Sequence, residues 1–417
     1  MRPTWTEVSL PRLRENFRSI QQHVGKQVTV CAVVKADAYG HGATECARAL
    51  EQAGATWFGV TSTEEGVALR NAGVSARVLL MTGYWKDEEE EVVAHQLTPV
   101  VWDPWHIRRL ARAAAKLQRA PFPVHLKVDT GMARLGASRR SLPDLLDLLS
   151  SNRALRLEGV CTHLKSAEIL DAPDVRDQLE CFAGIRKTIE RAGVHTDYYH
   201  VANTAALASH PDTWNNMVRP GIALYGYHLH FSCDESSVPI SVPLVKPVLS
   251  WKTRVLSLHE VGANASIGYD GAYVTSAPTR LAVLPVGYAD GLSRQMSSRG
   301  RVLIHGAYAS MVGNIAMDIT TVDVTDLARV RVGDEVTLIG SDGSGCLTAW
   351  EQARIQGTIP YEVLCRIGGR VRREYVDPPS IEEHSAHISS AGAGDWSEHW
   401  ARAGRRSCSS GLERPDT

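Results

Sequence analysis

The sequence lacks several features that identify whole classes of protein. Its 45 Lys and Arg residues nearly balance 46 Asp and Glu residues, so no excess charge favours nucleic acid or an anionic membrane. No apolar run approaches the roughly 18–20 residues that cross a bilayer, and residues 1–5 lack the apolar core of a signal peptide. The eight cysteines are scattered without a C-x-x-C pair, which favours reduced thiols over disulfides or zinc. We therefore expect no nucleic-acid or membrane partner, no metal site and a cytoplasmic location.

The sequence also has neither a G-x-x-x-x-G-K-[ST] loop nor a G-x-G-x-x-G motif after a strand, which argues against a nucleotide-binding protein. Its 417 residues suffice for two domains. Strand-like and helix-like segments alternate through the first half, a pattern that predicts an α/β fold, a (β/α)₈ barrel. The predicted strands are 28–34, 56–60, 77–82, 98–102, 122–128, 155–161, 197–202 and 222–226.

The pattern changes after Tyr227, where residues 228–248 are rich in Pro and Ser and read as a linker. From about Val248 short strand-like segments are punctuated by Gly and Asp, which predicts a mostly β C-terminal domain. We expect the barrel to span residues 9–240. The β-rich domain would comprise residues 1–8 and 241–376, because residues 2–9 also read as a strand. Residues 377–417 are rich in Ser, Gly, Ala, His and Arg and have almost no aliphatic pattern, so we expect a disordered tail.

Lys35 stands at the end of the predicted strand 28–34 and before the glycines Gly40 and Gly42. Barrels place their chemistry at the carboxyl ends of their strands. Desolvation there would lower the pKa of the lysine and make its neutral, nucleophilic amine accessible. The alternative is a lysine that simply leaves a strand for solvent.

The segment from Ala32 to Gly42, AVVKADAYGHG, closely resembles the lysine segment of the alanine racemase family, whose members depend on pyridoxal phosphate (PLP) and have fold type III. The resemblance implies that Lys35 carries PLP as a Schiff base. It also implies that Tyr39 touches the cofactor phosphate.

Further segments resemble the same family in the same order along the chain. From residues 127–136 the resemblance implies that Arg134 reaches the cofactor and the substrate, and that Lys127 is a carbamate paired with it. From residues 162–168 it implies that His163 lies under the pyridine ring. The remaining cofactor-binding residues that it implies are Asn203, Thr204, Arg219, Gly221, Ile222 and Tyr361.

Two of these assignments also have a physical rationale. Thr204 supplies a hydroxyl at a predicted helix start, which suits a phosphate. Arg219, which by resemblance faces the pyridine nitrogen, stays protonated and cannot readily donate a proton to the ring. That property favours racemisation over transamination.

The second domain contributes three residues by resemblance: Tyr269 as the second catalytic base, Tyr288 in the substrate pocket and Met317 at the substrate carboxylate. Asn314 stands where the family often has arginine. In the family this tyrosine comes from the partner subunit, so the resemblance implies a homodimer with shared active sites.

The implied reaction interconverts L- and D-alanine, with Lys35 and Tyr269 as opposed bases, and supplies D-alanine for peptidoglycan. One alternative is a racemase of the same fold with broader specificity, for example for serine. A second is a related PLP decarboxylase, which Arg219 opposes because that group needs an acidic residue there. A third is a PLP-carrying regulatory barrel. The predicted second domain argues against it, because such proteins lack a β domain with a residue like Tyr269.

Overall fold

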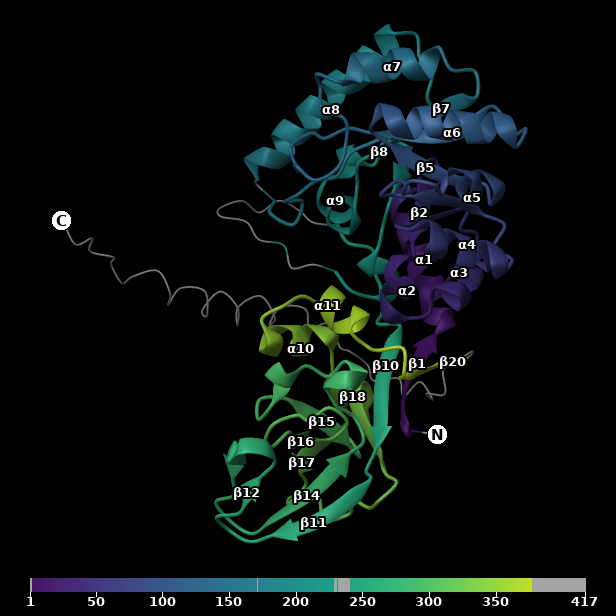
Figure 1. Ribbon diagram of the computed structural model, residues 1–417. Coiled ribbons are helices and arrows are strands. Elements are labelled where there is room, and N and C mark those ends of the chain that lie inside the picture. Colours follow the sequence, from purple (N-terminus) through teal and green to yellow (C-terminus); the bar gives the residue numbers. More distant parts are fainter. Residues whose placement is uncertain (1, 171, 229–230, 232–240, 377–417) are drawn as a thin grey trace, which may run out of the picture. The chain divides into compact units, whose positions relative to one another are not determined.

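The protein is described from a computed structural model, which covers residues 2–170, 172–228, 231 and 241–376 (Figure 1). The predicted fold class is confirmed, since an eight-stranded parallel barrel is followed by a mostly β domain. The predicted tail 377–417 lies outside the described residues. No helix in the described part of the chain is long and apolar enough to cross a membrane.

The barrel sheet is parallel and runs in the order β8-β7-β6-β5-β4-β3-β2-β9. Its two ends meet where the backbone amide of Arg219 donates to the carbonyl of Ala202 at 2.9 Å. The strands are β2 (Thr29–Val33), β3 (Trp57–Val60), β4 (Arg77–Leu80), β5 (Leu97–Val101), β6 (Phe122–Lys127), β7 (Leu155–Cys161), β8 (Tyr198–His200) and β9 (Met217–Val218).

Seven of these strands overlap the predicted ones, but the strand predicted at 222–226 is wrong. That segment is a 3₁₀ turn, η2 (Ile222–Tyr225), and the eighth strand is the two-residue β9 before it. All four residues of η2 are buried, and Gly226 ends the turn in a left-handed conformation with φ of 90°. A short apolar run of this kind fits a buried strand and a buried helical turn equally well, so periodicity could not separate them.

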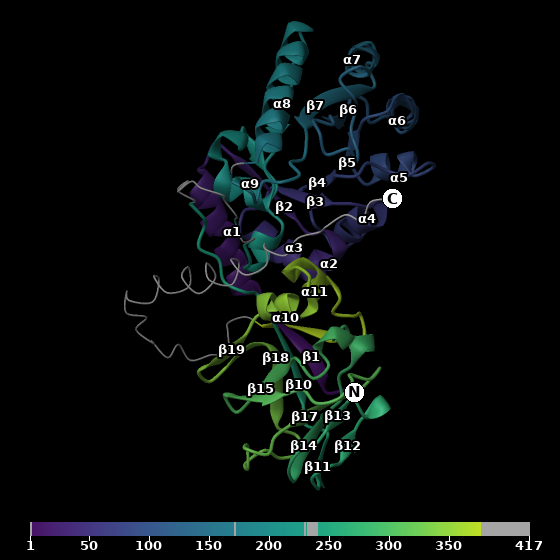
Figure 2. The same cartoon turned by 90° about the vertical axis from the view of Figure 1, so that its left-hand side faces the viewer.

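Helices cover the outside of the barrel strands, as both views show (Figures 1 and 2). The sequence pattern explains α6 well: the Asp103 carboxylate caps its first turn by accepting from the Trp105 amide at 3.0 Å, and Ile107 and Leu110 bury its inner face. The helices are α1 (Leu10–Val24), α3 (Ala43–Gln52), α4 (Thr63–Asn71), α5 (Glu89–Ala94), α6 (Pro104–Lys116), α7 (Leu142–Ser150), α8 (Pro173–Arg191) and α9 (Thr204–Ser209).

The main sheet of the second domain has the order β16-β15-β18-β10-β1-β20, with β19 beside β18. The first strand of the chain, β1, lies in this sheet between β10 and β20. The strands are β1 (Thr4–Ser9), β10 (Leu249–Arg254), β15 (Arg301–Ile304), β16 (Ala307–Ser310), β18 (Glu335–Asp342), β19 (Gly345–Leu347) and β20 (Arg372–Val376). Because Ser9 ends β1 and also caps α1, the chain passes directly from this sheet into the barrel.

Two smaller sheets and two helices complete the second domain. The three-stranded sheet contains β11 (Ser257–Val261), β14 (Thr279–Leu284) and β17 (Thr320–Asp323), and the two-stranded sheet contains β12 (Ser266–Ile267) and β13 (Tyr273–Val274). The helices are α10 (Ala349–Gln356) and α11 (Pro360–Cys365).

The second domain packs against the turn that follows Lys35. Gly40 approaches α11 so closely that a Cβ atom there would lie 2.4 Å from the carbonyl oxygen of Leu364. The Arg373 side chain, on β20, donates to the carbonyl of Gly40 at 3.1 Å. The start of the barrel site is therefore held in place by the β domain of the same chain.

Candidate active site

A cavity of about 870 Å³, counting its opening to solvent, lies at the carboxyl ends of the barrel strands. It collects residues that are far apart in the sequence and that the sequence analysis had selected: Lys35, Tyr39, Lys127, Arg134, His163, Asn203, Thr204, Arg219, Gly221 and Tyr361. Ile222 follows Gly221 and is buried, with 1% of its surface exposed. Most of the candidate site thus converges in one place.

Lys35 begins α2 (Lys35–Gly40), which is a left-handed turn despite having no glycine before Gly40. Residues 36–39 have φ angles between 52° and 55°, a conformation that costs roughly 1–2 kcal/mol per non-glycine residue. The Glu65 carboxylate offsets part of this cost, because it accepts from the Ala36 amide at 2.6 Å and from the Thr61 amide at 2.8 Å.

Further contacts hold the same turn from its other end. The Asp37 carboxylate accepts from the Ala43 amide at 2.8 Å, where α3 begins. The buried His41 ring lies 2.9 Å from the carbonyl of Ala38 through Nδ1, which must therefore donate. The turn is fixed in this way with Lys35 and Tyr39 both lining the cavity.

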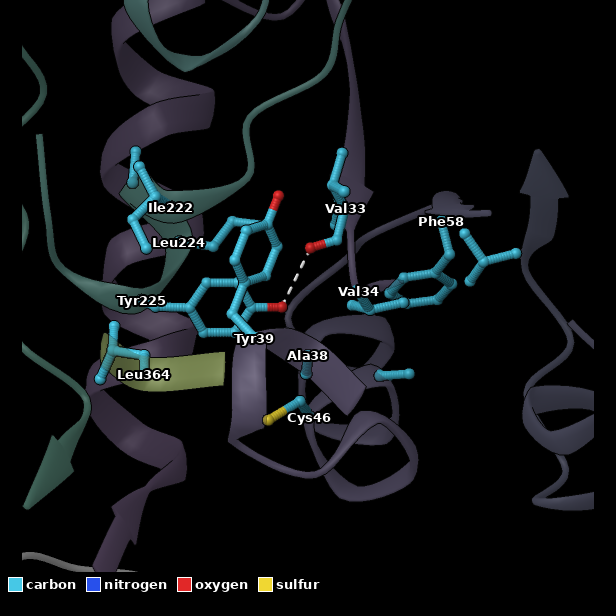
Figure 3. Packing of buried hydrophobic residues seen from close by; sticks show 14 of the residues in the cluster. Val33, Val34, Ala38, Tyr39, Cys46, Phe58, Ile222, Leu224, Tyr225 and Leu364 are labelled. Carbon is cyan, nitrogen blue, oxygen red and sulfur yellow. Dashed lines mark hydrogen bonds between the residues drawn. The ribbon is translucent and has the colours of Figure 1, made fainter. Parts of the chain in front are cut away.

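Tyr39 belongs to a packed group of buried side chains (Figure 3). Its ring centroid lies 5.0 Å from that of Tyr225, and the Tyr225 hydroxyl donates to the carbonyl of Val33 at 3.0 Å. Since Val33 is the last residue of β2, this contact ties η2 to the strand that presents Lys35.

Positive charges dominate the cavity. Burial lowers the pKa of Lys35, the nearby Arg134 lowers it further, and Glu65 opposes them. Burial also lowers the pKa of Lys127, with Arg219, Arg134 and Lys35 acting in the same direction. Burial and then Arg219 lower the pKa of His163 to about 3, so this ring is neutral. A cavity of this kind favours an anionic ligand.

One end of the cavity suits a phosphate group. The hydroxyl-bearing rings of Tyr39 and Tyr361 lie 5.8 Å apart between centroids, and the Thr204 hydroxyl accepts from the Gly221 amide at 2.9 Å. A Cβ atom on Gly221 would lie 2.3 Å from the Tyr39 hydroxyl, so a side chain at this position would displace that hydroxyl. Hydroxyls at one end and a lysine amine in the same cavity fit PLP.

Arg219 lines the cavity, and its side chain is buried and held by several hydrogen bonds. It donates to Nδ1 and to the carbonyl of His200, both at 2.7 Å, and to the carbonyls of Thr162 at 2.8 Å and Val201 at 3.1 Å. Burial lowers the pKa of Arg219 from its ordinary value. These four acceptors fix the orientation of the guanidinium.

Sequence reasoning missed four residues near the site: Glu65, His125, Glu158 and His200. Glu65 carried a signal, since Ser62 and Glu65 have capping-box spacing, but its carboxylate turns to the Ala36 amide instead. The other three carried a different signal, since each is a polar or charged residue between two apolar neighbours in the sequence.

The three predicted residues of the second domain do not line this cavity. Tyr269, Tyr288 and Met317 are exposed, at 70%, 43% and 53% of their surface. They lie on connected segments of that domain, because Asn314 donates to the carbonyl of Tyr269 at 3.2 Å and the Tyr288 amide donates to Ala316 at 3.0 Å. In a single chain these three residues are therefore exposed and are not part of the cavity.

The fold and the cavity define a two-domain protein whose barrel holds a lysine amine in a cationic, phosphate-compatible site. The family described as "Alanine racemase, N-terminal domain" matches residues 8–229, and "Alanine racemase, C-terminal domain" matches residues 248–375. The chain belongs to the alanine racemase family.

Relatives of known name agree. The chain is 38% identical to the alanine racemase of Sorangium cellulosum, over 91% of this chain and 100% of that protein. It is 40% identical to the alanine racemase of Carboxydothermus hydrogenoformans, over 90% of this chain and 100% of that protein.

Solved structures show the same fold. The alanine racemase of Streptomyces coelicolor A3(2) has a TM-score of 0.83 and 34% identity, covering 90% of this chain and 98% of that one. The alanine racemase of Bartonella henselae, solved with covalently bound pyridoxal phosphate, has a TM-score of 0.78 and 30% identity, covering 90% of this chain and 100% of that one.

The charges around Lys35 predict how its amine titrates. Because Arg134 lowers the pKa of Lys35 and Glu65 raises it, Arg134→Gln should move that pKa up and Glu65→Gln should move it down. The measurement is the pH dependence of Lys35 acylation in ligand-free protein, followed by peptide mass spectrometry. Lys252, which pairs with Glu7 and Glu335 in the β domain, is an internal control that neither variant should shift. Shifts of the same sign in both variants would contradict the account.

Proposed function

We propose that this chain is an alanine racemase that interconverts L- and D-alanine with PLP bound to Lys35. It would supply D-alanine for peptidoglycan in the cytoplasm, a compartment that suits the free thiols of all six described cysteines. The observation that carries the proposal is the convergence of a lysine amine, phosphate-compatible hydroxyls and a buried arginine in one cavity.

PLP, when bound, supplies an electron sink that acidifies the α-proton of the amino acid. The chain's own residues would hold and orient it. Its phosphate would be bound by Tyr39, Asn203, Thr204, Gly221, Ile222 and Tyr361, and its ring would lie near His163 and Arg219. Since a guanidinium has no bare nitrogen and stays protonated, Arg219 would not hand a proton to the ring nitrogen.

Lys35 would also serve as one of two bases. Its lowered pKa increases the neutral fraction of the amine, which can accept a proton from one face of the substrate. Arg134 would bind the substrate on the same side. Lys127 would be carbamylated, since its cationic form is buried among Arg219, Arg134 and Lys35, and a carbamate would replace this repulsion by attraction to Arg134.

The second base would be Tyr269 of a partner subunit, in a homodimer with shared active sites. The proposal is supported by the exposure of Tyr269, Tyr288 and Met317 together on the β domain, away from their own chain's cavity. Met317 would meet the substrate carboxylate, and Tyr288 would line the substrate pocket. Each chain would thus complete the other chain's site.

The function is tested by D-alanine formation from L-alanine. We expect a kcat in the ordinary range of about 1–10³ s⁻¹, loss of activity after PLP removal, and recovery when PLP is added back. Lys35→Ala should lower kcat at least about 10³-fold, because both the covalent attachment and one base are lost. Absence of racemisation in the PLP-loaded protein would contradict the proposal. In a panel of amino acids, serine turned over as fast as alanine would favour the broader-specificity racemase.

The shared site is tested by complementation. Lys35→Ala and Tyr269→Phe should each be nearly inactive alone, but a mixed dimer of the two has one site with both lesions and one with neither. Activity should reappear, up to half that of wild type per mixed dimer. Tyr308→Phe, a change at another exposed tyrosine of the β domain, is the control and should be active alone. No recovery in a verified mixed dimer would refute the exchange of Tyr269.

A further inference from the structure

The interior of the barrel contains a chain of polar side chains where a barrel normally packs branched apolar ones. His125 on β6, Glu158 on β7 and His200 on β8 are each exposed by 1% or less. Their neighbours form a small apolar cluster that includes Trp57, Leu79 and Val100. Burying polar groups costs free energy unless they are hydrogen-bonded, so a chain of three calls for an explanation.

The three side chains connect Arg219 to two arginines on the far side of the interior. Nη1 of Arg219 lies 2.7 Å from Nδ1 of His200, and Nε2 of His200 lies 2.8 Å from Nδ1 of His125. Nε2 of His125 lies 3.4 Å from Oε2 of Glu158. The Glu158 carboxylate also accepts hydrogen bonds from Arg77 and Arg156.

The direction of each hydrogen bond follows from the first. Arg219 can only donate, so Nδ1 of His200 must be bare. Burial and then Arg219 hold the pKa of His200 well below its usual range, and burial lowers the pKa of His125, so each ring carries one proton. His200 then donates through Nε2–H to a bare Nδ1 of His125. His125 in turn donates through its own Nε2–H to Glu158.

Glu158 supplies the negative end of this chain. Burial raises its pKa, but hydrogen bonds from His125 and Arg77 outweigh burial and lower the pKa to about 2. The carboxylate is therefore ionised. In contrast, the guanidinium of Arg219 has one imidazole and three carbonyls as hydrogen-bond acceptors, so Glu158 is the anion to which this chain leads.

The backbone is shaped to hold this chain. The pairing of β6 with β7 shifts register at His125, so that Val124 pairs with Leu157 and His125 pairs with Gly159, leaving Glu158 as the extra residue of a bulge. A Cβ atom on Gly159 would lie 2.7 Å from the His125 ring. The absent side chain at Gly159 therefore makes room for the imidazole.

We propose that His125 and Glu158 are positioning residues for Arg219. Acting through His200, they keep Nδ1 of that ring unprotonated and directed at the guanidinium. The negative charge of Glu158 also polarises the two imidazoles, so that each N–H points away from the cavity. The proposal rests on the proposed function, because it concerns the arginine expected at the cofactor ring. It predicts that the charge of Glu158, which two imidazole rings separate from Arg219, affects turnover.

The ring nitrogens of ¹⁵N-histidine-labelled protein provide the first test, with and without PLP. Spectra of His125→Gln and His200→Gln assign the two rings. We expect a bare Nδ1 and a protonated Nε2 on both rings of the wild-type protein. A proton on Nδ1 of His200 would overturn the proposal without reference to any variant or to racemase activity.

The second test is Glu158→Gln, which keeps the side-chain size and removes the charge. We expect the signals of both rings to move and kcat to fall about 10-fold, the lower end of the range seen when the hydrogen-bond partner of a metal-bound histidine is lost, with little change in KM. The matched control is Glu335→Gln, which breaks an ion pair with Lys252 in the β domain and should change neither. An unchanged kcat in folded Glu158→Gln would overturn the positioning role. A wild-type protein without racemase activity would instead overturn the proposed function, while the ring spectra would still confirm or refute the hydrogen-bond direction.

Discussion

The site depends on the left-handed turn that follows β2. Four successive residues without glycine adopt a conformation that each of them disfavours, and this turn is what places Lys35 and Tyr39 at one cavity. Part of its stability comes from outside the turn. Glu65 of α4 binds its first amide, and α11 and Arg373 of the β domain contact Gly40 at its end. The β domain is therefore part of what shapes the barrel site in its own chain.

A second constraint is charge. Lys35, Lys127, Arg134 and Arg219 line one cavity, and burial and mutual repulsion lower the pKa values of both lysines. A site of this kind is stable when it meets anions such as the phosphate of a cofactor and the carboxylate of an amino acid. The neutral imidazoles between Glu158 and Arg219 fit this arrangement, since they transmit orientation without adding charge.

Much of the fold could be predicted from the sequence because alternating apolar patterns report burial directly. Seven barrel strands were predicted correctly in this way, whereas the strand predicted at 222–226 is wrong, because the four buried apolar residues of η2 have no period that separates a strand from a helical turn. The cavity residues could be selected because Lys35 ends a strand and its segment resembles a family. The left-handed turn could not be predicted, since Ala36 to Tyr39 contain no glycine to indicate it. The role of Glu65 was hidden by a local capping pattern that the tertiary fold overrides.

The residues of the second domain illustrate another limit. The resemblance selected Tyr269, Tyr288 and Met317, but only the three-dimensional structure shows that their own chain leaves them exposed. Likewise, His125 and Glu158 are polar residues of two different strands, and only the register shift between β6 and β7 shows that they lie together. Such contacts depend on pairings between distant strands, which the local sequence pattern does not contain.

The central claim is that Lys35 carries the cofactor. Borohydride reduction of the PLP-loaded protein makes the bond between a lysine and the cofactor permanent, and peptide mass spectrometry then locates it. The account predicts that the pyridoxyl phosphate group is found on the peptide containing Lys35 and is absent from the peptide containing Lys127, the other lysine of the cavity. A group on Lys127, or on any lysine other than Lys35, would contradict it.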